Sequence, residues 1–192
     1  MDTRNDTPAA TSTPTATADL PLEPGRWALD PAHARVGFAV RHMGLAKVRG
    51  HFGEVDATLV VGATPDETSV EATIATASID TGNAFRDSNL RSADVLDVER
   101  RPTITFRSTG LTASDGAWRL EGDLTVGDVT GPVALDVEFG GVAEVFGGAR
   151  HAGFDARGEV RRKDFGLAFG AADPMVGQVV ELTLDLEFVE PS

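Results

Sequence analysis

Cysteine is absent from this chain of 192 residues, and so is tyrosine. Without cysteine there are no disulfides, no thiolate metal sites and no cysteine nucleophile, and the chain fits a reducing compartment. The four histidines are His33, His42, His51 and His151. They are scattered, with no i, i+4 or His-x-His pair to preorganise a metal site, so the sequence alone predicts no metal centre and no cofactor.

Long apolar runs are also missing, and none approaches the length of an integral membrane segment. Basic residues are scarce, with 17 Lys and Arg against 30 Asp and Glu and a net charge of -13. Such an acidic surface repels phosphate backbones and anionic bilayers. We therefore expect no nucleic-acid partner.

Residues 1–24 are rich in Thr, Ala and Pro and contain few large apolar side chains. Such a segment buries too little surface to offset the entropy of ordering, which predicts a disordered tail and one folded domain over residues 25–192. The segment lacks the positive start and Leu/Val-rich stretch of a secretory signal, which favours the cytoplasm. A mis-assigned start or export without a leader are the alternatives.

The rest of the chain alternates apolar and polar residues with a period of two, which is typical of strands with one buried face. The clearest segment is "VVELTLDLEF", where Val180 to Phe188 place every second side chain on an apolar face. We expect about eight strands, over residues 33–42, 53–61, 69–76, 103–108, 118–126, 132–139, 154–160 and 179–188. Single apolar faces and short turns favour an antiparallel up-and-down barrel or a sandwich over a covered parallel sheet.

Several inward positions are small: Ala57, Ala72, Gly122, Ala156 and Gly158. Small lining residues favour a barrel with a hollow interior over two sheets pressed together, although sandwiches also contain them. Residues 78–97 interrupt the alternation with a polar stretch that predicts a short helical insert, started by Asp87 or Ser88. Over an open barrel end, this insert would act either as a fixed plug or as a gate.

Four stretches occur in order: "WALDPAHARVGFAVRHMGLAKVRGHF", "SIDTGNAFRDSNLRSADVLDVERRPTITFRS", "LEGDLTVGDVTGPVALDV" and "RRKDFGL". Together they closely resemble the YceI-like family of lipocalin-like polyisoprenoid-binding proteins, over residues 27–189. The resemblance implies an extended eight-stranded antiparallel up-and-down (lipocalin-like) barrel with a short helical insert. It also implies an isoprenoid lipid or quinone held in the barrel, no cofactor chemistry, and a homodimer in many members.

The chain departs from the family pattern at a few positions. Val95 and Leu96 stand where the family often has aromatic residues, Gly131 stands where it commonly has Lys, and Gly127 and Asp128 replace a frequent basic residue. These changes bear on the chain length or headgroup of a ligand more than on the fold.

The residues best suited to contact a ligand are the inward apolar ones, with plain core packing as the alternative. They are Phe38, Val40, Phe52, Ile74, Phe106, Leu124, Val126, Leu135, Phe165 and Leu184, with His42 as a polar contact. For His42 the simpler interpretation is a buried histidine satisfied by Asp30 or a backbone carbonyl. Arg86 and Arg91 in the insert and Arg161 in "RRKDFGL" are candidates for an anionic headgroup, whereas Asp87 is expected to fix the turn of the insert.

We expect a non-enzymatic protein that binds an amphipathic isoprenoid, such as a polyprenyl phosphate or a prenylated quinone, as a carrier, store or sequestering protein. The sequence shows no nucleophile-base set, no G-x-S-x-G and no recognisable pair of carboxylates. One alternative is a filled barrel that acts in structure or stress response through a protein partner. A less favoured alternative is an enzyme that acts on a bound lipid.

Overall fold

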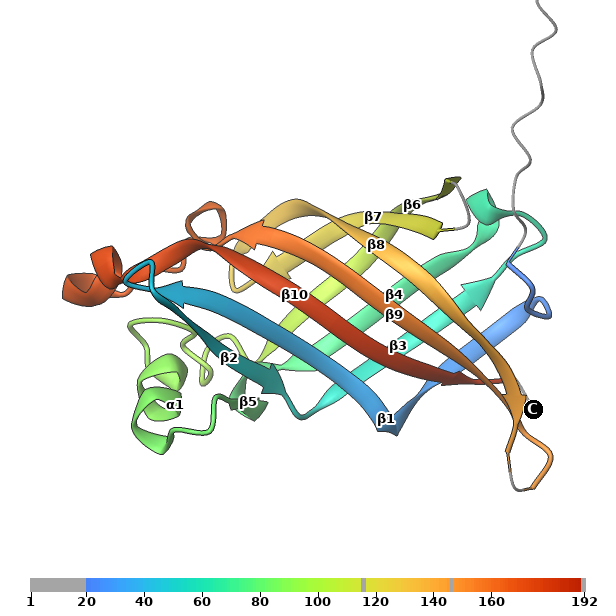
Figure 1. The fold of residues 1–192 in the computed structure, drawn as a ribbon, viewed down its shortest axis with the longest axis horizontal. Helices are drawn as coiled ribbons and strands as arrows, with labels where there is room; N and C mark the ends of the chain where they lie inside the picture. The colour runs from blue at the N-terminus through green and yellow to red at the C-terminus, as the bar shows by residue number, and fades with distance from the viewer. Residues whose placement is uncertain (1–19, 115–116, 146, 191–192) are drawn as a thin grey trace, which may run out of the picture.

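A computed structural model describes residues 20–114, 117–145 and 147–190 of the chain, and this part is built mainly of antiparallel strands (Figure 1). The strands of the described part are β1 (Gly25–His42), β2 (Ala46–Phe52), β3 (Val55–Val61), β4 (Ser69–Ala75), β5 (Ile79–Asp80), β6 (Thr103–Ser114), β7 (Ala117–Val126), β8 (Val129–Glu144), β9 (Arg150–Arg161) and β10 (Val176–Val189). Their order in the sheet is β10-β9-β8-β7-β6-β4-β3-β1-β2-β5, and β10 also pairs with β1.

The pairing of β1 with β10 closes the sheet into a barrel. The start of β1 pairs with β3, with Gly25 opposite Val61, and its end pairs with β2, with Val36 opposite Phe52. β2 and β3 are therefore consecutive halves of one wall segment, while the two residues of β5 pair only with β2. The described residues thus form the predicted eight-stranded up-and-down barrel, because successive wall segments are neighbours around it.

A bulge interrupts the closing seam between β1 and β10. Leu29 lies opposite Phe188 and Ala34 lies opposite Leu186, so four residues of β1 face the single residue Glu187 of β10. Extra residues in one strand of an antiparallel pair leave the ladder and bend the strand. Beyond the bulge the register is regular again, from Ala34 opposite Leu186 to Val40 opposite Val180.

The barrel end that contains Leu22 and Phe188 is packed tightly. Trp27 is fully buried there, in a cluster with Leu22, Leu29 and Phe188. The Trp27 indole nitrogen donates to the carbonyl of Glu23 at 3.0 Å, so its one polar group is paired. The sequence pattern placed residues 20–24 in the tail. In the structure, Leu22 packs against this apolar cluster and anchors these residues to the barrel. Residues 1–19 lie outside the described residues.

The polar insert carries the helix α1 (Ala84–Arg91), which lies at the opposite end of the barrel (Figure 1). Its N-cap is Asn83, whose side chain accepts from the backbone N–H of Arg86, and not Asp87 or Ser88 as expected. Asp87 is buried and accepts from the backbone and hydroxyl of Thr81. No described helix is both long enough and apolar enough to span a bilayer.

Four short 3₁₀ turns connect the described strands: η1 (Pro65–Glu67), η2 (Thr76–Ser78), η3 (Arg162–Phe165) and η4 (Gly170–Met175). Two of them, η3 and η4, lie between β9 and β10 and flank the same end of the barrel as α1 (Figure 1). This end is therefore assembled from the insert, the β1–β2 hairpin and the β9–β10 connection.

Candidate ligand cavity

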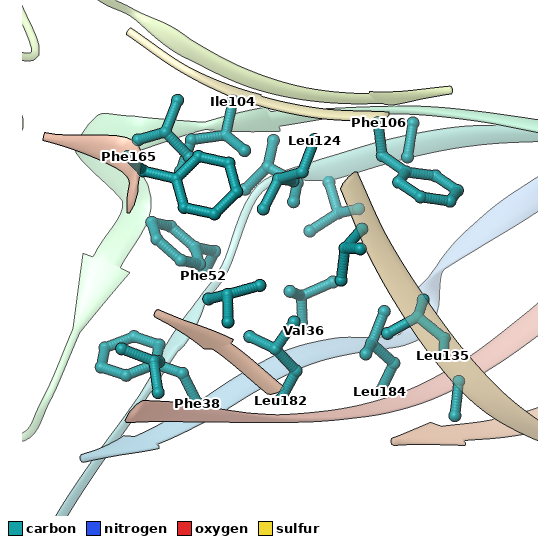
Figure 2. Close-up of a pocket in the computed structure, with 18 of the residues that line it drawn as sticks. Val36, Phe38, Phe52, Ile104, Phe106, Leu124, Leu135, Phe165, Leu182 and Leu184 are labelled. Carbon is teal, nitrogen blue, oxygen red and sulfur yellow. The ribbon is translucent and has the colours of Figure 1, made fainter. Parts of the chain in front are cut away.

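The strands enclose a cavity of about 510 Å³ instead of pressing their apolar faces together. Its lining includes the inward face of β10, where Leu182, Leu184 and Leu186 remain only half-buried although they point into the barrel. Figure 2 shows Leu182 and Leu184 at one side of the group of lining side chains, with Phe52 and Phe106 at other positions around it. The volume lies within the usual range of small-molecule sites, so the interior is large enough for a ligand.

The sequence pattern correctly placed the inward residues. All eleven residues proposed to contact a ligand line the cavity: Phe38, Val40, His42, Phe52, Ile74, Phe106, Leu124, Val126, Leu135, Phe165 and Leu184. Ten of these eleven side chains are apolar. Nine of the ten lie on strands, where inward positions alternate with outward polar ones, and Phe165 belongs to η3. The lining is thus suited to hydrocarbon, with no acidic side chain among the described residues that form it.

Two inward glycines make room for aromatic rings against the wall. A Cβ on Gly122 would overlap the ring of Phe106, and one on Gly50 would overlap the ring of Phe38. The Phe38 ring also packs against Phe52, with the ring centroids 5.7 Å apart. We expected the small Gly122 to leave empty space in the interior. Instead, the ring of Phe106 occupies the space beside Gly122.

Polar groups gather where the cavity reaches the surface. Arg41, His42 and Asn89 line the cavity and are also exposed, so the opening lies between the end of β1 and α1. Arg86 lines it as well and is half-buried. The charged residues in the described lining are Arg41, Arg86 and Arg162, so the polar end of the cavity is basic although the chain is acidic.

His42 is exposed at this opening, and the interpretation of a buried histidine held by Asp30 is wrong. Asp30 instead bonds His33, with Oδ2 2.8 Å from Nδ1, on the outside of the barrel. That hydrogen bond lowers the pKa of Asp30, and the same bond, with the nearby Glu187 carboxylate, raises the pKa of His33. The two histidines of the "DPAHARVGFAVRH" stretch thus have separate environments.

The arginines of the insert are bound to its own backbone. Arg86 donates from Nε to the Thr81 hydroxyl at 2.7 Å and from Nη2 to the Thr81 carbonyl at 3.0 Å. Arg91 donates to the carbonyls of Ala77 and Ile79 and lies outside the cavity lining. These contacts, together with the buried Val95 and Leu96 of the same insert, anchor α1 at the barrel end.

Arg161 also lies outside the lining, whereas its neighbour Arg162 is part of it. Arg162 is 2% exposed and donates to the carbonyls of Leu167, Val176 and Gly177. The sequence pattern could have identified Arg162, because the inward residues Ala156 and Val160 of β9 also have even numbers and the same alternation extends to position 162. The Arg162 guanidinium holds the pKa of the Asp173 carboxyl well below its usual range, with a further contribution from Lys163.

Comparison with known families matches residues 27–188 to the YceI-like domain. The chain belongs to the YceI-like family. This YceI-like chain is 35% identical over 159 residues to the Escherichia coli O157:H7 protein YceI, and the match covers 82% of each chain. The family assignment agrees with the resemblance carried by the four sequence stretches.

Two solved structures have the same fold as this YceI-like barrel. Burkholderia cenocepacia BcnA superimposes with a TM-score of 0.75 at 21% identity, over 83% of this chain and 98% of BcnA. A polyisoprenoid binding domain from Saccharophagus degradans, implicated in plant cell wall breakdown, gives 0.60 at 13% identity over 86% and 98%. At sequence identities of 21% and 13%, the structural similarity shows a shared fold.

Proposed function

We propose that this YceI-like protein binds an amphipathic isoprenoid lipid, with the apolar chain inside the barrel and the headgroup at the basic opening. A polyprenyl phosphate or a prenylated quinone has this combination of parts. The observation that carries the proposal is the cavity of about 510 Å³, lined by apolar side chains and open at Arg41 and His42. The polyisoprenoid binding of the Saccharophagus degradans domain supports the same ligand class.

The energetics favour a chain ligand. Each CH₂ group moved from water into the cavity contributes about 0.8 kcal/mol, so several isoprene units supply substantial affinity without polar contacts. Lost rigid-body and chain freedom offsets part of this gain. The headgroup then decides orientation, because an anionic or hydrogen-bond-accepting group is stabilised next to arginine and not in the apolar interior.

A carrier, storage or sequestering role follows from this arrangement better than the alternatives. The filled barrel that would act only through a protein partner does not agree with the hollow interior. Exposed apolar side chains at the opening, namely Met43, Leu45 and Met175, support passage of a lipid at this end. Met43 and Met175 lie next to each other, since the backbone N–H of Met43 donates to the Met175 carbonyl at 2.7 Å.

Native mass spectrometry of protein purified without detergent or organic solvent tests the proposal. We expect a bound lipid mass in the unmodified protein and its loss in Leu184→Trp, because the indole fills part of the cavity. Thr183→Trp is the matched control, since Thr183 is the adjacent outward residue of β10. Barrels that stay empty and take up no added prenyl lipid, or equal lipid content in both variants, would refute the proposal.

A further inference from the structure

A second cluster of ionisable side chains lies on the outside of the barrel, at the bulge of the closing seam. Asp30 and His33 belong to the four bulged residues of β1, and Glu187 is the single β10 residue opposite them. His151 of β9 adjoins the same carboxylates. None of these four residues lines the cavity, so the cluster is separate from the proposed lipid site.

The three residues at the seam bring one potential ligand atom each to a common point. The Nδ1 of His33 lies 2.8 Å from Asp30 Oδ2 and 3.7 Å from Glu187 Oε2. One donor atom from each residue lies within 4.8 Å of the others. Ligand atoms bound to zinc at about 2.0–2.2 Å in a tetrahedron are about 3.3–3.6 Å apart, and the two His33 distances lie on either side of this range.

The surroundings orient these atoms. The backbone N–H of Ala32 donates to Asp30 Oδ1 at 2.9 Å, which leaves Oδ2 directed at His33. From the other side, His151 Nδ1 lies 3.2 Å from Glu187 Oε2 and 3.8 Å from Asp30 Oδ2. Such second contacts to ligating carboxylates fix their orientation in metal sites.

We propose that Asp30, His33 and Glu187 bind a divalent transition-metal ion, with His151 positioning the two carboxylates. One imidazole nitrogen with two carboxylate oxygens suits zinc, whereas all-oxygen sites are preferred by magnesium and calcium. The two carboxylates neutralise the ion. The side chain of His33 is 62% exposed, whereas that of Asp30 is 17% exposed, so the site is open to solvent on one side and built into the wall on the other.

The consequence for the fold is a cross-link. The proposed ion joins the bulge of the first strand to the last strand, at the place where their backbone ladder is interrupted. Binding to the folded barrel and not to the unfolded chain raises thermal stability, by an amount that grows with the logarithm of the free zinc concentration once that concentration exceeds the dissociation constant. The effect requires no lipid in the cavity, so it is independent of the proposed function.

Calorimetric titration of the full chain with zinc chloride tests the proposal, with magnesium chloride as the comparison ion. We expect one zinc per chain, a higher midpoint of thermal unfolding with zinc, and no saturable magnesium binding. His33→Ala should weaken zinc binding at least tenfold. His51→Ala is the matched control and should bind as the unmodified chain does, because His51 belongs to β2 and pairs with Gly37, beyond the bulge that carries the proposed site.

Glu187→Gln provides a second variant, since it removes a ligand charge with almost no change of shape, and it should also weaken binding at least tenfold. Circular dichroism of each variant without metal checks that the barrel is folded. Absence of saturable zinc binding by the unmodified chain would overturn the proposal. Zinc affinity that is unchanged in folded His33→Ala or Glu187→Gln would overturn it equally, since the ion would then bind elsewhere.

Discussion

Arg162 and Asp173 form an ion pair beside the cavity, with Nη1 and Oδ1 2.6 Å apart, the Arg162 side chain 2% exposed and the Asp173 side chain 22% exposed. Asp173 belongs to η4, and Arg162 begins η3. The remaining guanidinium N–H groups donate to backbone carbonyls, including those of Val176 and Gly177 at the start of β10. One side chain therefore ties the whole β9–β10 connection to the barrel end.

Arg162→Ala should destabilise the protein strongly. The substitution removes the nearest cation from Asp173 and leaves the carbonyls of Leu167, Asp173, Val176 and Gly177 without the guanidinium donor. Each acceptor left buried and unpaired costs about 1–3 kcal/mol. The free energy of unfolding in urea measures the effect. Lys163→Ala is the control, because Lys163 contacts the same carboxylate at 2.9 Å but is 50% exposed. An exposed pair contributes about 0–1 kcal/mol, so equal losses in the two variants would contradict the assignment.

The stability that this ion pair contributes should decrease at acid pH. Hydrogen bonds from Arg162 and Lys163 lower the pKa of Asp173 in the folded protein. The resulting stabilisation is fully present above the unfolded-state pKa of about 3.9 and is lost as the pH falls through the lower, folded-state value.

In Asp173→Asn this titration is absent. The variant should unfold at a lower temperature than the unmodified protein at pH 7, and the gap between the two melting temperatures should narrow as the pH is lowered below about 4. Melting curves between pH 7 and pH 2 provide the measurement. A constant or widening gap would mean that another group dominates the acid response of this region.

The choice of a barrel over a sandwich came from the small inward residues and the resemblance to the YceI-like family. The alternation of side chains predicted the strands and their inward faces, because a period of two assigns each residue to one face of the wall. It missed β2, whose segment "AKVRGHF" contains charges and a glycine, and β5, which has two residues. β2 is stabilised by its pairing with β1, from Val36 opposite Phe52 to His42 opposite Ala46. A local pattern carries no information on such a partner.

The headgroup candidates show a second limit. Arg161 and Arg162 differ by one position, and which of them faces the cavity depends on whether the β9 alternation continues into η3. Arg41 follows Val40 on β1 and would point outward in a regular strand, yet it lines the opening near the end of that strand. Likewise, His33 and His151 both lie close to the Glu187 carboxylate because of the bulge in β1, and the sequence pattern does not predict that bulge.

Arg41→Ala should reduce affinity for a prenyl phosphate more than for the corresponding neutral prenol. Because Arg41 is exposed at the opening, its contribution is that of a solvent-screened ion pair, about 0.5–1 kcal/mol, or roughly a two- to fivefold change in dissociation constant. Displacement of a fluorescent fatty ligand measures both affinities, and added salt should reduce the difference.

Arg49→Ala is the comparison for this variant. Arg49 is an exposed arginine of the neighbouring strand β2 but does not line the cavity, so it changes the net charge equally without touching the opening. Equal losses of affinity for the prenyl phosphate in the two variants would mean that the loss comes from the change in net charge. The headgroup would then not bind at Arg41.

The pairing of β1 with β10 means that the first and last strands of the barrel are direct neighbours. During synthesis, β1 emerges about 150 residues before its partner, and contacts so distant in sequence form late in folding. Until the last strand docks, the interior is an open trough with two unpaired edges, one on β1 and one on β9. A hydrophobic guest is therefore enclosed only after β10 has been synthesised and has paired with β1, and a chain truncated before β10 has no compartment in which to retain it.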